Sequence, residues 1–141
     1  MKRIFTLLLL VPTFFFLGCS KDFLKSYNRR IIGQWHIRDV KRIGIGGDID
    51  ELPFRSGTLY FNENGTLSYT DRLNRQYSGS WEIIKRYRDE NTTQSLQITA
   101  IDFNNQVVLS EYYDDLNFRS TDHFVANNVR NFHTYVTHFR R

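Results

Sequence analysis

The sequence predicts an all-β domain of about eight antiparallel strands, arranged as an up-and-down barrel. Three observations support this fold class. Several segments alternate apolar and polar residues, which is the period of a half-buried strand. Aromatic residues make up 16% of the 141-residue chain, and with β-branched residues they favour sheet over helix. After residue 30 the alternating segments are separated by polar turns and no helical pattern is convincing.

The first strand is expected over residues 31–40. Its alternation places Trp35 and Ile37 on one face, and Gln34, His36 and Arg38 on the other. Residues 42–53, which follow it, are rich in glycine and aspartate and form a loop that is unusually long for a compact domain. This loop is a candidate lid.

The best-defined local element is a hairpin around Asn64-Gly65, because these two residue types supply the positive φ angles of a tight turn. The polar run 88–94 is expected to end the fourth strand. The other expected strands are residues 59–61, 66–69, 76–87, 95–103, 107–113, 118–125 and 132–139, with turns at Asn104-Asn105, Asp114-Asp115 and Asn127-Asn128. Eight sequential strands close most economically into a barrel, which removes the exposed edges of the sheet.

The N-terminus has the pattern of a secretory signal: a basic start at Lys2 and Arg3, then an apolar run that ends at Gly18. The run from Ile4 to Gly18 is too short to span a bilayer as a helix, which takes about 20 residues. The sequence from Phe16 to Cys19 resembles the bacterial lipobox. The resemblance implies a signal peptide over residues 1–18, an acylated Cys19 and a polar tether over residues 19–30. The alternative is an ordinary signal followed by a buried cysteine.

This organisation predicts a protein of the cell envelope, attached to a membrane through its lipid. Ser20-Lys21-Asp22 is similar to the signal that directs some Gram-negative lipoproteins to the surface of the outer membrane, and the expected location is the outer membrane, facing the periplasm or the surface. Removal of residues 1–18 takes away Lys2 and Arg3, so the net charge falls from +4 to +2. A single cysteine excludes an intramolecular disulfide and a multi-thiolate zinc site.

Three short motifs resemble those of lipocalins, and the resemblance extends over residues 31–141. They are Gly33-x-Trp35, the Phe61-x-x-x-Gly65-Thr66 hairpin and Tyr77-x-Gly79-x-Trp81. The resemblance implies that Trp35 closes one end of a barrel, that Gly33 leaves room for its ring, and that Arg119 or Arg140 packs over it. The alternative is that Trp35 and Trp81 are ordinary core residues of another β-sandwich.

Motifs for catalysis, cofactors and metals are not found, and a non-enzymatic protein without a cofactor is expected. The Gly44-x-Gly46-Gly47 loop lacks the third glycine of a dinucleotide site. His133 and His138 fall on opposite faces of one strand, and His123 could approach His133 across a hairpin, but a metal site is not expected. Glu111, Asp114 and Asp115 are explained by turn chemistry. Nucleic acid is not an expected partner, since the mature net charge is small.

Two functions stay open. In the first, the barrel binds a small apolar or amphipathic ligand and the loop 42–53 covers its mouth. The candidate lining residues are Ile37, Phe54, Tyr69, Ile83, Ile98, Leu109 and Phe118. In the second, the same residues fill the barrel, and the protein is an interaction or structural module that contacts a surface protein through exposed residues such as Tyr112, Tyr113 and Tyr135. The volume available to a ligand distinguishes the two.

Overall fold

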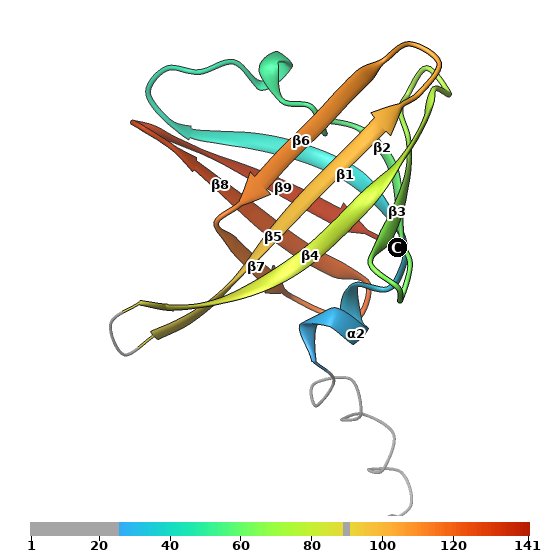
Figure 1. The fold of residues 1–141 in the computed structure, drawn as a ribbon. Helices are drawn as coiled ribbons and strands as arrows, with labels where there is room; N and C mark the ends of the chain where they lie inside the picture. The colour runs from blue at the N-terminus through green and yellow to red at the C-terminus, as the bar shows by residue number, and fades with distance from the viewer. Residues whose placement is uncertain (1–25, 89–90) are drawn as a thin grey trace, which may run out of the picture.

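The computed structural model describes residues 26–88 and 91–141, and within these residues the fold is all-β (Figure 1). The expected signal peptide and Cys19 lie outside the described residues. The elements are α2 (Tyr27–Ile31), β1 (Gly33–Gly44), η2 (Ile49–Glu51), β2 (Gly57–Phe61), β3 (Thr66–Thr70), β4 (Gln76–Arg88), β5 (Asn91–Asp102), β6 (Val107–Tyr113), β7 (Asp115–Phe118), β8 (His123–Arg130) and β9 (His133–Arg140).

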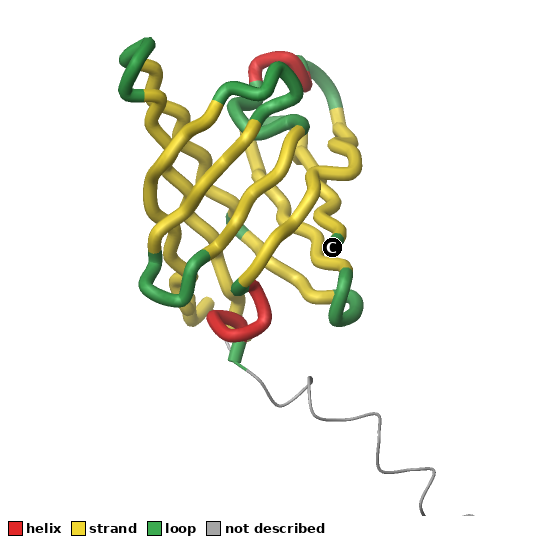
Figure 2. The backbone as a smooth tube through the Cα atoms, turned by 90° about the vertical axis from the view of Figure 1, so that its right-hand side faces the viewer, coloured by secondary structure: helices red, strands yellow, loops and turns green. Residues whose placement is uncertain are grey.

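The nine strands of the described chain form one antiparallel sheet with the order β6-β5-β4-β3-β2-β1-β9-β8-β7. The sheet is strongly curved (Figures 1 and 2). The buried apolar side chains form one core cluster. The short helix α2 lies at one end, called the helix end, and η2 lies at the other, called the loop end (Figure 2). No helix in the described residues is long and apolar enough to cross a membrane.

The sheet is not closed, because no backbone ladder joins its edge strands β6 and β7. These strands are nevertheless two halves of one segment: the first half pairs with β5 and the second with β8. Asp114 lies at the break, where its N–H donates to Asn127 O at 2.7 Å and its carboxylate accepts from Val129 N at 2.8 Å. Asp114 O also accepts a hydrogen bond from the Ser95 hydroxyl at 3.0 Å. Asp114 therefore links β5 to β8 across the open seam.

Two predictions near the C-terminus are wrong. Residues 118–125 are not one strand, since β7 ends at Phe118 and β8 begins at His123. Asn127-Asn128 is not a turn but lies within β8, where carboxylates of two other strands accept from the side-chain amides. Asp115 of the paired strand β7 accepts from Asn127, and Glu111 of β6, across the seam, accepts from Asn128. A further difference is that β5 begins at Asn91, within the polar run expected to separate two strands.

The long loop is shifted relative to the expected 42–53, because β1 continues to Gly44 and β2 begins at Gly57. Leu52 and Phe54 are buried, and the Phe54 ring packs edge-on against Tyr69 at 5.0 Å. The Tyr69 hydroxyl donates to Ser56 O at 2.6 Å, and burial raises the pKa of Tyr69 to about 12. The loop is therefore tied to the core at the loop end.

Candidate functional site

Helix α2 is held against the helix end of the sheet by contacts from both ends of the chain. The Trp35 indole N–H donates to Ile31 O at 2.6 Å, and the Arg141 guanidinium donates to Arg30 O at 2.9 Å and to Ile32 O at 2.6 Å. Tyr27 packs edge-on against Phe118 with ring centroids 5.3 Å apart. A five-residue helix is marginal by itself, so these contacts fix its position.

Trp35 is completely buried behind this helix, with the Phe124 ring 4.6 Å away. Arg141 lies over its indole at 4.4 Å, a cation–π contact. The expectation that Arg119 or Arg140 occupies this place is wrong. Alternation along β9 carried the missing signal: Phe139 faces the core, so Arg140 faces outward and Arg141 turns back toward the end of the sheet.

Gly33 does not leave room for the Trp35 ring. Its φ of +112° is a conformation that favours glycine, and the side chain nearest to it is Arg141, at 3.7 Å from an ideal Cβ position. The glycine therefore shapes the turn between α2 and β1, close to the Arg141 side chain.

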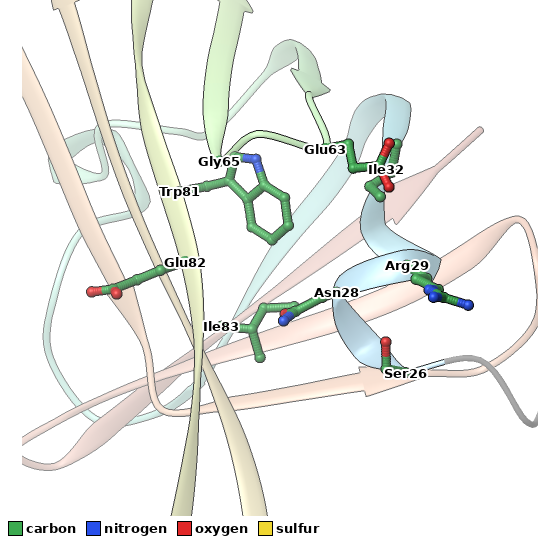
Figure 3. A pocket seen from close by; sticks show the side chains of 9 residues that line it. All are labelled: Ser26, Asn28, Arg29, Ile32, Glu63, Gly65, Trp81, Glu82 and Ile83. Carbon is green, nitrogen blue, oxygen red and sulfur yellow. The ribbon is translucent and has the colours of Figure 1, made fainter.

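A pocket of about 360 Å³ lies between α2 and β4 at the helix end (Figure 3). Its residues are Ser26, Asn28, Arg29, Ile32, Glu63, Gly65, Trp81, Glu82 and Ile83. The side chains of Trp81 and Ile83 point from β4 toward α2, whereas Glu82 points to the other side of the strand (Figure 3).

The two walls of this helix-end pocket differ in chemistry. The β4 wall presents Trp81 and Ile83, while the α2 wall presents Ser26, Asn28 and Arg29. The indole is fixed in place, because its N–H donates to Asn62 O at 3.0 Å and its ring packs edge-on against Phe61 at 5.6 Å. An apolar wall opposite a polar one suits an amphipathic molecule.

The expected lining residues are packed rather than arranged around an open cup. Ile98 has no exposed surface, and Phe54, Tyr69, Ile37 and Phe118 belong to the same buried cluster. A water-sized cavity beside Ile98 would expose part of its surface, so the interior around this residue is filled. Leu109 and Ile83 are partly buried at the margin of the cluster. Of the seven expected lining residues, Ile83 alone lines the helix-end pocket.

Two of the motif glycines lie close to Trp81. Gly65 lines the helix-end pocket from the β2–β3 turn, as expected for the hairpin residue with a positive φ. Gly79 lies in β4 opposite Ala100, where β5 approaches closely. The residues on α2 and Glu63 were not predicted, because their contact with β4 is tertiary and the local sequence carries no signal for it.

A second polar cluster lies on the seam and joins the edge strand β6 to β8. Arg130 donates to both oxygens of Glu111, at 3.2 and 3.1 Å, and the Asn128 amide donates to the same carboxylate. The pKa of Glu111 is raised mainly by burial of its side chain, and the positive charge of Arg130 opposes this shift. The cluster was predicted only as turn chemistry.

We expect Glu111→Gln to change how stability depends on pH. The raised pKa means that burial disfavours the ionised carboxyl in the folded protein. The wild type is therefore expected to lose stability, relative to the variant, as the pH rises from the ordinary value of 4.5 through the raised pKa. The glutamine side chain of the variant keeps an oxygen acceptor for Asn128 and Arg130. Denaturant unfolding between pH 4 and 8 measures this difference, and a difference that is constant with pH would contradict it.

The histidines pair differently from the expected approach of His123 to His133. His123 Nε2 lies 3.2 Å from His138 Nδ1, and His133 packs against Tyr135 instead. Burial is the main reason that the pKa of His123 is lowered. No three His, Cys, Asp or Glu side chains gather as a possible metal site in residues 26–88 and 91–141.

Comparison of the chain with protein-family models, with curated proteins and with solved structures gives no match.

Proposed function

We propose that this protein is an envelope lipoprotein that binds a small amphipathic molecule in the helix-end pocket. The observation that carries the proposal is the pocket itself, whose volume of about 360 Å³ is within the usual range for small-molecule sites. Burial of an apolar chain against Trp81 and Ile83 would supply about 25 cal/mol per Å². Arg29, Asn28 and Ser26 would face the polar group of the ligand.

We further propose that the curved sheet is a lipocalin-like barrel. Support comes from the sequential order of the strands, from the Gly33-x-Trp35 motif beside a short helix at one end, and from the C-terminal Arg141 packed over Trp35. The ligand site differs from the central cup that the resemblance implied, because the interior is packed.

The proposed anchor and the pocket are close in sequence. Ser26 follows Cys19 by seven positions, and a fully extended chain of that length reaches at most about 25 Å. Acylation of Cys19 would therefore hold the helix end near the membrane. A pocket in that place is well situated for a molecule that partitions between the membrane and water.

Ligand binding is tested by filling the pocket. Ile83→Trp is expected to weaken binding of decanoate at least tenfold, because the larger side chain occupies the space between β4 and α2. Ile84→Trp is the matched control, since the neighbouring residue faces the opposite side of the strand. Isothermal titration calorimetry with both variants measures the effect. Equal weakening in the two variants, or none in Ile83→Trp, would show that decanoate does not bind in this pocket.

The anchor is tested separately. Cys19→Ala is expected to move the protein from the membrane fraction to the soluble fraction of cells that express the full chain, because the acylated thiol is lost. Metabolic labelling with a palmitate analogue, followed by fractionation, checks both the lipid and the location. If the alanine variant stays membrane-bound, the lipoprotein proposal is wrong.

The packed interior favours a second candidate function, in which the protein is an interaction module of a surface assembly. Two of the three tyrosines expected to be exposed contacts, Tyr113 and Tyr135, are buried, so they cannot serve this role. A partner would have to use other parts of the sheet.

A further inference from the structure

The edge strand β6 has one side that no other strand covers. Its ladder is formed with β5 only. The Tyr112 N–H donates to the Glu111 carboxylate at 3.1 Å, and the same carboxylate binds Asn128 of β8. The Tyr112 N–H therefore points toward β8 and away from β5. Alternate residues of an antiparallel strand direct their backbone groups the same way. The N–H and C=O groups of Val108 and Ser110 therefore face the open edge.

Features that usually protect an edge strand are missing from the first part of β6. Val107 to Ser110 contain no proline, no charged residue and no bulge, and Val108 is 62% exposed. Natural proteins avoid such edges unless something covers them, because exposed backbone groups with apolar side chains pair readily with another strand. The edge is thus competent for strand addition.

The open length of this edge is limited by the seam. At Glu111 the edge is joined to β8 through Arg130 and Asn128, so the free part covers Val107 to Ser110. The free part begins at the turn that joins β5 to β6, and the strand can be followed in Figure 1.

Where β6 is joined to β8, the Arg130–Glu111 ion pair exposes its positive partner more than its negative one. The Arg130 side chain is 39% exposed, whereas the side chain of its partner Glu111 is only 5% exposed. The surface there presents a positive guanidinium while the negative carboxylate lies beneath it. An acidic group of a partner would be attracted to this end.

We propose that β6 binds an extended peptide segment of a partner protein by antiparallel strand addition along Val107–Ser110. Backbone bonds to Val108 and Ser110 supply the affinity, as in other β-augmentation complexes. The segment has apolar side chains at the alternate positions that face Val107 and Leu109, and an acidic side chain at its N-terminal end, beside Arg130. This inference goes beyond the proposed ligand pocket and does not depend on it.

The test uses a synthetic peptide with the order Asp-Thr-Val-Thr-Val-Thr, in which the first two threonines face Ser110 and Val108. The matched control is the same peptide N-methylated at these two threonines, which cannot donate to β6. Ser110→Pro in the full chain removes the outward N–H but leaves the ladder to β5 intact. Ser110→Ala controls for the hydroxyl, which contacts Thr99 Oγ1 at 3.3 Å.

We expect the peptide to bind the wild type and Ser110→Ala equally, and Ser110→Pro at least tenfold more weakly. Amide hydrogen exchange should slow at Val108 and Ser110 when the peptide is added. The methylated peptide should not bind, which keeps the test decisive even if Ser110→Pro does not fold. No binding at millimolar peptide, or equal binding of both peptides, overturns the proposal. Self-association of the protein through Val108 and Ser110 also overturns it, because the occupant is then a second copy.

Discussion

Trp35→Ala is expected to lower the free energy of unfolding by about 3–5 kcal/mol, the range found when a buried tryptophan or phenylalanine is truncated to alanine. Trp35 is completely buried and packs against Phe124, and its indole N–H holds Ile31 O. The substitution removes the ring, the hydrogen bond and the surface on which Arg141 lies. Denaturant unfolding monitored by circular dichroism measures the loss.

Trp35→Phe separates packing from the hydrogen bond. The phenyl ring keeps much of the buried surface but leaves Ile31 O without its donor, so a smaller loss is expected. Because α2 loses one of its contacts in both variants, amide exchange in Tyr27–Ile31 is expected to become faster, while Tyr27 still packs against Phe118. A loss below about 1 kcal/mol for Trp35→Ala would contradict the burial described for this residue.

Gly79→Ala is expected to destabilise the protein by at least about 3 kcal/mol, at the upper end of overpacking effects. A Cβ at this position would overlap Thr99 O and come within 2.8 Å of Ala100 Cα. Both are groups of β5, so the clash is with main chain rather than with a side chain that can move. Strands β4 and β5 form the longest ladder of the sheet, and relief of the clash must separate them.

Gly65→Ala is the matched control for this prediction. An ideal Cβ at Gly65 has no neighbour closer than Trp81 O at 3.7 Å, but its φ is +80°. Its expected cost is the backbone strain alone, about 1–2 kcal/mol. If the two alanine variants unfold at the same denaturant concentration with the same slope, the close approach of β5 to Gly79 is not significant.

Local sequence patterns were sufficient to predict the strands in the N-terminal half of the chain. The hairpin around Asn64-Gly65 is confirmed, with Phe61 opposite Leu67. Only Gly65 has the expected positive φ, whereas Asn64 does not; the turn chemistry is still contained in neighbouring residues. The alternation that placed Trp35 and Ile37 on one face is confirmed by their burial. These features depend on neighbours in the sequence.

Features of the seam could not be predicted in this way. Asn127 and Asn128 have the composition of a turn, but they continue a strand because Asp115 and Glu111 accept from their amides. These partners are 12 and 17 residues away, so the information is tertiary. The helix-end pocket has the same origin, since Ser26 and Trp81 meet only when α2 packs beside β4.

The measurement that tests the central proposal most directly is fluorine NMR of the protein with both tryptophans replaced by 5-fluorotryptophan. The chain contains two tryptophans: Trp81 lines the pocket and is 9% exposed, whereas Trp35 has no exposed surface. The proposal predicts that decanoate shifts the Trp81 resonance saturably and leaves the Trp35 resonance in place. A spectrum in which neither resonance moves, or in which Trp35 alone moves, would contradict binding in the helix-end pocket.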